Sequence, residues 1–105
     1  RLSPAELIAT LNRVAGENGV GRIDIMEDRM LGLKVRENYE CPAAVTILTA
    51  HQALEALVLT RDELRFKAQV DAEWAQLWFD PFKEDLEAFI NNTQKRVTGT
   101  VWLRL

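Results

Sequence analysis

The stretch RIDIMEDRMLGLKVRENYECP, residues 22–42, contains two runs in which apolar residues recur at every second position. The alternating apolar positions are Ile23, Ile25, Leu31, Leu33 and Val35. A period of two is typical of a strand that turns one face towards a core. The pattern predicts a β-hairpin that turns around Glu27-Asp28-Arg29.

A helical period precedes this hairpin. Ser3-Pro4-Ala5-Glu6 is typical of a helix start, because the serine can cap the first turn, the proline gives up no needed N–H, and the glutamate completes a capping box. Apolar residues then recur at helical spacing, which predicts a helix that ends at Gly16 in a left-handed conformation. Asn18-Gly19 suits the tight turn that follows.

Three further helices and one strand are predicted after the hairpin. Pro42 opens a helix that runs to about Leu59, and the capping-box sequence Thr60-Arg61-Asp62-Glu63 starts the next one. Asp80-Pro81 starts a fourth helix, and the alternation over residues 101–105 predicts a final strand. The predicted order is αββαααβ.

This order predicts the fold class. Because strands and helices do not alternate regularly, we expect an α+β fold in which helices pack on a small antiparallel or mixed sheet. The chain contains no internal repeat or linker-like segment, so residues 1–105 are expected to form a single domain or fragment.

Composition and charge exclude several classes of protein. The 105 residues are 48% hydrophobic and 28% charged, a balance typical of one globular domain. The net charge of -3 comes without a basic stripe, so nucleic acid is not an expected partner. No apolar run approaches the roughly 18 residues of a membrane span, so no membrane partner is expected. A single cysteine, Cys41, favours the cytoplasm.

Two motifs that suggest chemistry have simpler interpretations. The glycines at 16, 19 and 21 lack the Gly-Lys-Ser/Thr ending of a phosphate loop, so they are interpreted as turn residues. His51 suggests a base or a ligand, but its place on an apolar helical face favours a hydrogen-bonded core residue. The sequence therefore predicts no catalytic, cofactor-binding or metal-binding residue.

Aromatic and charged side chains form two further groups. Trp74, Trp78 and Phe79 are predicted to fill a core or an interface, and Trp102 to lie at an interface. The segment from Arg22 to Tyr39 carries more charged and polar groups than a turn requires, which favours a binding role for it. Solvated surface charges are the alternative interpretation.

The sequence as a whole resembles the argininosuccinate synthase family. The likeness is carried, in order, by NGVGRID (18–24), EDR (27–29), GLKVR (32–36), YECPA (39–43), AH (50–51), WFDP (78–81) and TQKRVTGT (93–100). These motifs span nearly all of the chain, and their joint occurrence is specific although each one is short.

The resemblance implies a cytoplasmic, usually tetrameric ligase of arginine biosynthesis, which joins citrulline to aspartate and uses ATP and magnesium. In that family the ureido oxygen of citrulline attacks the α-phosphate, and the aspartate amine then displaces AMP. The nucleotide is held by an N-terminal domain with a Ser-Gly-Gly-x-Asp loop, which this sequence lacks. The chain is therefore expected to be a C-terminal fragment that is inactive alone, as a start at Arg1 also suggests.

Two residues match citrulline contacts of the family, Glu27 and Tyr39. A carboxylate can pair with the α-ammonium of an amino acid, and a phenol can form one directed hydrogen bond, so both suit substrate positioning. We expect them to face a shared depression, with no structural ion pair at Glu27. To bring them together, either the chain turns after Arg36 so that Tyr39 approaches the hairpin tip, or the hairpin bends back over the helix that begins at Pro42.

Two departures from the family pattern and one alternative remain. Val35 stands where the family commonly has serine, and several residues that the family usually has around Gln76 and Leu77 are missing.

The alternative function is a free-standing, non-catalytic α+β interaction or assembly module that docks through Trp102. A nucleotide-binding domain upstream in the reading frame favours the fragment, and a start codon close to Arg1 favours the module.

Overall fold

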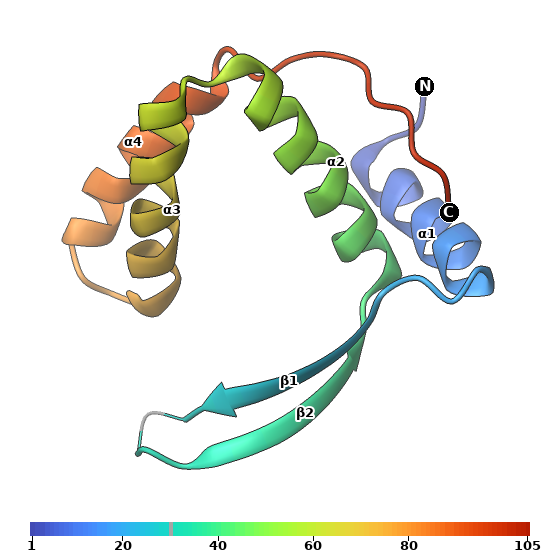
Figure 1. Ribbon diagram of the computed structural model, residues 1–105, viewed down its shortest axis with the longest axis horizontal. Coiled ribbons are helices and arrows are strands. Elements are labelled where there is room, and N and C mark those ends of the chain that lie inside the picture. The colour runs from blue at the N-terminus through green and yellow to red at the C-terminus, as the bar shows by residue number, and fades with distance from the viewer. Residues whose placement is uncertain (30) are drawn as a thin grey trace. The chain divides into compact units, whose positions relative to one another are not determined.

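A computed structural model describes residues 1–29 and 31–105, in which six regular elements follow one another (Figure 1). They are α1 (Pro4–Glu17), β1 (Arg22–Asp28), β2 (Lys34–Glu40), α2 (Pro42–Val58), α3 (Arg61–Gln76) and α4 (Phe82–Gln94). The two strands pair antiparallel. The predicted α+β class and the order of the first six elements are confirmed.

The chain divides into two compact units. Arg1–Ala50 together with Leu103–Leu105 form the first, which we call the hairpin unit, and His51–Trp102 form the second, which we call the helical unit. The boundary falls within α2, so this helix contributes residues to both units. That residues 1–105 form one domain stays a prediction.

Both predicted capping boxes are present. The Ser3 hydroxyl accepts a hydrogen bond from the Glu6 N–H at 3.3 Å, and the Glu6 carboxylate accepts one from the Ser3 N–H at 2.8 Å. Thr60 and Glu63 repeat this arrangement at the start of α3, with distances of 3.2 and 2.8 Å. Capping interactions of this kind stabilise a helix by about 1 kcal/mol each, so they explain where α1 and α3 begin.

The end of α1 differs from the predicted one. The helix continues through Glu17, and Gly16 does not adopt the left-handed conformation expected of it. Instead the Asn18 amide donates to the Val14 carbonyl at 2.8 Å, and the positive φ of 74° falls at Gly19. The Gly19 N–H donates to the Gly16 carbonyl at 3.0 Å and the Val20 N–H donates to the Ala15 carbonyl at 2.9 Å, so the left-handed stop is present but lies three residues later than predicted.

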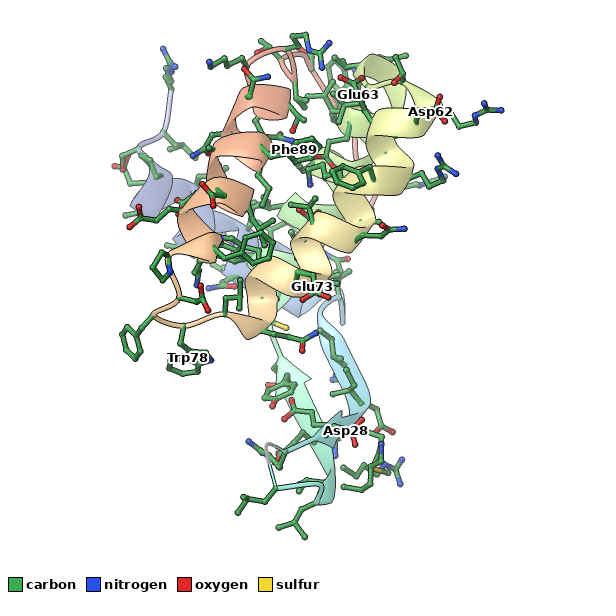
Figure 2. All side chains as sticks on the ribbon, turned by 90° about the vertical axis from the view of Figure 1, so that its left-hand side faces the viewer. Asp28, Asp62, Glu63, Glu73, Trp78 and Phe89 are labelled. Atoms are coloured by element: carbon green, nitrogen blue, oxygen red, sulfur yellow. The ribbon has the colours of Figure 1, made fainter. Side chains whose placement is uncertain are left out.

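The hairpin turn also lies later than predicted. Asp28 is still in the ladder, where it pairs with Lys34, so the expected turn around Glu27-Asp28-Arg29 is wrong. The connection between the strands includes Gly32, whose φ of 77° is easily reached only by a residue without a side chain. Figure 2 shows Asp28 close to the far end of the hairpin.

The base of the hairpin is held by close backbone packing within its unit. The Cys41 N–H donates to the Gly21 carbonyl at 2.9 Å. The Asn12 side chain on α1 accepts a hydrogen bond from the Ala43 N–H at the start of α2, also at 2.9 Å. Gly21 has a φ of 98°, and a Cβ there would meet the Pro42 Cα at 2.4 Å. These contacts fix the direction in which the hairpin leaves the helices of its unit.

α3 and α4 pack against each other in the helical unit. Phe66 on α3 and Phe89 on α4 meet edge to face, with ring centroids 5.3 Å apart (Figure 2). Val70 on α3 is buried, and the Lys83 ammonium lies 4.3 Å from the centroid of the Trp74 ring. An edge-to-face pair contributes about 0.5–1.5 kcal/mol beyond its buried area, so these contacts hold the two helices together.

The predicted final strand is not formed. Residues 101–105 have no regular structure, and in the described part of the chain the sheet consists of β1 and β2 alone. A strand needs a hydrogen-bonding neighbour, which an alternating pattern by itself does not provide. Within the described hairpin unit no helix forms a layer over the hairpin, so Ile25, Met26 and Leu33 are 44%, 59% and 62% exposed. The expected packing of helices on the sheet is therefore not found in this unit.

Candidate functional site

One face of the hairpin gathers polar side chains. Successive strand residues point to opposite faces, so the odd-numbered positions of β1 and β2 share one face. In the observed register Ile25 lies opposite Glu37 and Ile23 lies opposite Tyr39. The polar group on this face, which we call the hairpin cluster, consists of Glu27, Arg29, Glu37 and Tyr39.

Direct contacts join the four members of the hairpin cluster. The Tyr39 hydroxyl donates a short hydrogen bond to Glu27 Oε1. Arg29 Nη2 donates to Glu37 Oε1 at 2.7 Å and lies 3.5 Å from Glu27 Oε2. The side chains of Glu27 and Glu37 are 28% and 33% exposed, so solvent reaches the cluster from one side. The cluster presents two carboxylates, one phenol and one guanidinium.

The structure brings Glu27 and Tyr39 together by a route that differs from both of the expected ones. β2 remains in the ladder through Glu40, so the chain does not bend after Arg36. The long tyrosine side chain instead leans along the strand and reaches Glu27, whose cross-strand pair is four positions along the ladder and the second one further on the same face. The expectation that Glu27 has no ion pair is wrong, because Arg29 continues the same face beyond the end of β1.

The electrostatics of the hairpin cluster keep Tyr39 protonated. The hydrogen bond to Glu27 raises the pKa of the Tyr39 phenol above its usual value of about 10, and partial burial and the negative charges of Glu27 and Glu37 act in the same direction. The positive charge of Arg29 opposes this shift. At neutral pH the phenol is therefore a hydrogen-bond donor, which suits binding rather than proton transfer.

The opposite face of the hairpin carries ion pairs that are fully satisfied by each other. Arg36 donates to both carboxylate oxygens of Asp24, at 2.8 and 2.5 Å, which lowers the pKa of Asp24. Lys34 pairs with Asp28 nearer the turn. All four side chains are at least half exposed, and such pairs contribute only about 0–1 kcal/mol each. These pairs support strand pairing, and both of their carboxylates already have a cationic partner.

A surface depression lies at the base of the hairpin. Its volume is about 410 Å³, and its lining residues are Arg22, Ile23, Asp24, Asn38, Tyr39 and Glu40. Tyr39 lines this depression and Glu27 does not, so the expected depression shared by the two residues is not found there. Their side chains meet further along the strand.

Arg29 and Glu37 are members of the cluster that sequence reasoning missed. The alternation of strand residues could have indicated them, because odd-numbered positions of both strands share a face once the register is known. The turn was expected two residues too early, so Arg29 was assigned to the loop tip instead of the end of a face. Val35, which replaces a serine common in the family pattern, lies directly opposite Glu27.

His51 is not the core residue that was expected. Its side chain is 44% exposed, and its Nε2 lies 3.3 Å from Glu55 Oε1. Glu55 and Lys67 are instead buried members of a polar network in the helical unit, where Glu55 Oε1 accepts a hydrogen bond from Gln94 at 2.6 Å and lies 3.2 Å from the Lys67 ammonium. This network joins α2, α3 and α4, and no spacing within one helix indicates it.

The aromatic residues around the turn after α3 are mostly exposed. α3 ends at Gln76, and the chain passes directly into the turn, where Trp78 and Phe79 are 77% and 95% exposed. The expectation that these two side chains fill a core of this chain is therefore wrong, which leaves the expectation of an interface. Trp102 is 91% exposed.

Residues 1–29 and 31–105 contain no candidate metal site and no candidate membrane span. No three His, Cys, Asp or Glu side chains there are grouped closely enough to hold a metal ion. None of the helices in these ranges has the length and apolarity needed to cross a membrane.

Comparison with known proteins matches the whole chain. Residues 1–105 match the family model described as Arginosuccinate synthase C-terminal domain. The argininosuccinate synthase of Methanocaldococcus jannaschii is 64% identical over 110 residues, which cover 100% of this chain and 28% of that protein. The synthases of Haloquadratum walsbyi and Methanopyrus kandleri are 62% and 57% identical, over 96% and 100% of this chain. The chain spans little more than a quarter of the length of these relatives.

Proposed function

The chain belongs to the argininosuccinate synthase family, and we propose that it supplies part of the citrulline-binding wall of such an enzyme. In this proposal Glu27 and Tyr39 contact citrulline, and the remainder of the enzyme binds ATP, magnesium and aspartate. The complete enzyme is proposed to act in arginine biosynthesis as a cytoplasmic homo-oligomer, a tetramer as in its family. The alternative of a free-standing interaction module has no counterpart among the relatives named above, which carry the name of an enzyme.

The hairpin cluster can recognise the ammonium end of an amino acid. Glu27 offers a carboxylate that is partly exposed and held by one hydrogen bond to Oε1. An ammonium group that approaches Oε2 would form a charge-assisted hydrogen bond, which is about twice as strong as a neutral one. The protonated Tyr39 phenol fixes the orientation of the carboxylate, so that less freedom is lost when the substrate binds.

One observation carries this proposal more than any other. The two residues that match citrulline contacts by family resemblance are joined by a direct hydrogen bond on one face of the hairpin. Twelve positions of sequence separate them, and the antiparallel register brings them within reach. A pair that only stabilised the hairpin would resemble the exposed cross-strand pairs on the opposite face.

Activity should require the remainder of the enzyme. We expect the isolated chain to form neither argininosuccinate nor AMP from ATP, citrulline and aspartate, because it lacks the phosphate-binding loop of the family. An argininosuccinate synthase of one of its relatives in which this chain replaces the matching segment, which we call the complete enzyme, should release AMP only when citrulline is present. An assay of AMP release measures both; citrulline-dependent AMP from the isolated chain, or an inactive but folded complete enzyme, would contradict the proposal.

A further inference from the structure

The hairpin cluster contains a cation that substrate binding alone does not explain. Arg29 lies beside the carboxylate that is proposed to receive the ammonium of citrulline, so a positive charge already stands at the place where a positively charged group must bind. Such an arrangement would weaken binding if the arginine occupied the carboxylate oxygen that the ammonium needs, unless another partner held the arginine.

Glu37 is that other partner. Arg29 Nη2 lies 2.7 Å from Glu37 Oε1, the distance of a charge-assisted hydrogen bond, whereas its 3.5 Å distance to Glu27 Oε2 is that of a looser ion pair. The Arg29 N–H also donates to the Leu33 carbonyl at 2.9 Å, so the backbone of this residue is fixed as well. The guanidinium is therefore anchored on Glu37 and only faces Glu27.

The two oxygens of Glu27 have different surroundings. Oε1 accepts the hydrogen bond from Tyr39, and among the described contacts Oε2 has only the looser pairing with Arg29. Oε2 can therefore accept a hydrogen bond from an ammonium group without breaking a short contact. Arg29 would keep its hydrogen bond to Glu37 when this happens.

We propose that Arg29, anchored by Glu37, is a positioning residue that orients the Glu27 carboxylate for the α-ammonium of citrulline. It also separates two carboxylates that share a strand face and would otherwise repel each other. This inference rests on the proposed citrulline site, and it assigns to Arg29 no contact with the substrate.

Steady-state kinetics of the complete enzyme test this role. Arg29→Gln should raise the KM for citrulline about tenfold and leave kcat and the KM for ATP within about twofold, because binding is lost equally in the ground and transition states. Arg29→Lys should restore part of the affinity, since it keeps the charge and loses the planar geometry. Glu37→Gln should raise the KM for citrulline about threefold, since it weakens only the anchor.

The opposite face of the hairpin provides a matched control. Arg36→Gln removes an arginine from a cross-strand pair with Asp24 in the same two strands. It should change the KM for citrulline by less than about twofold, as expected for an exposed pair. If Arg29→Gln and Arg36→Gln have the same effect, Arg29 only supports the hairpin and the inference is wrong.

A double variant separates this inference from the proposed function. If Arg29 acts through Glu27, Arg29→Gln should add no further loss to Glu27→Gln, whereas losses that multiply would show an independent role and overturn the inference. An unchanged KM for citrulline in Glu27→Gln alone would instead overturn the proposed site. If Arg29→Gln does not fold, the KM for citrulline of Glu37→Gln is compared with that of Arg36→Gln. Equal values would overturn the inference.

Discussion

Replacement of Glu27 by glutamine in the complete enzyme should weaken citrulline binding by about 1.5–3 kcal/mol, the usual contribution of a hydrogen bond to a charged group. This corresponds to a loss of affinity of roughly ten- to 150-fold. Glutamine keeps an oxygen that can accept the hydrogen bond from Tyr39, so the hairpin should remain folded. It lacks the negative charge that the ammonium of the substrate requires. Calorimetric titration with citrulline, and separately with ATP, measures the effect.

Asp24→Asn is the matched control for this substitution. It makes the same change of charge and chemistry on the opposite face of the same strand, where Asp24 is paired with Arg36. Citrulline affinity should stay within about twofold, because this pair is exposed and lies away from the hairpin cluster. Equal losses in the two variants, or an equal loss of ATP affinity in Glu27→Gln, would show that the effect is not specific to a citrulline site.

Gly21→Ala should destabilise the chain by about 3 kcal/mol or more. A Cβ at this position would meet the Pro42 Cα at 2.4 Å, the Pro42 nitrogen at 2.5 Å and the Cys41 carbonyl carbon at 2.8 Å. These are backbone atoms at the start of α2, so they cannot move aside without displacing the helix, and overpacking of this kind costs about 1–3 kcal/mol. The φ of 98° adds about 1–2 kcal/mol for any residue with a side chain. Urea unfolding followed by circular dichroism measures the loss.

Gly19→Ala separates the two causes of this effect. Gly19 also has a positive φ, of 74°, but a Cβ there would meet nothing within 4 Å. Its replacement should therefore cost only the backbone strain of about 1–2 kcal/mol. If Gly21→Ala and Gly19→Ala had the same free energy of unfolding, the close approach between Gly21 and Pro42 would not hold the base of the hairpin.

Local signals in the sequence predicted most of the elements. Ser3 with Glu6 and Thr60 with Glu63 located the starts of two helices, because capping depends on residues only three positions apart. The alternation of apolar residues predicted both strands of the hairpin, because it also depends on residues that are close in sequence. The errors arose where a distant or competing contact decides the structure. The hairpin turn includes Gly32, which has a positive φ, and lies later than predicted. Residues 101–105 alternate in sequence, but they have no strand partner and form no strand.

The candidate site was predictable only in part. Family resemblance named Glu27 and Tyr39, and the structure adds that they touch. Arg29 and Glu37 could not be assigned to the same cluster before the register was known, since a shift of one residue moves every side chain to the other face. The buried network of Glu55, Lys67 and Gln94 was missed because its members come from three helices.

A crystal structure of the complete enzyme with citrulline would show whether Glu27 and Tyr39 contact the substrate. We expect the α-ammonium nitrogen of citrulline within about 3 Å of Glu27 Oε2, and a citrulline oxygen or nitrogen within hydrogen-bonding distance of the Tyr39 hydroxyl. Arg29 should still hold Glu37 in that complex. Citrulline bound in full occupancy beyond the reach of both Glu27 and Tyr39 would contradict the assignment of this hairpin as part of the citrulline site.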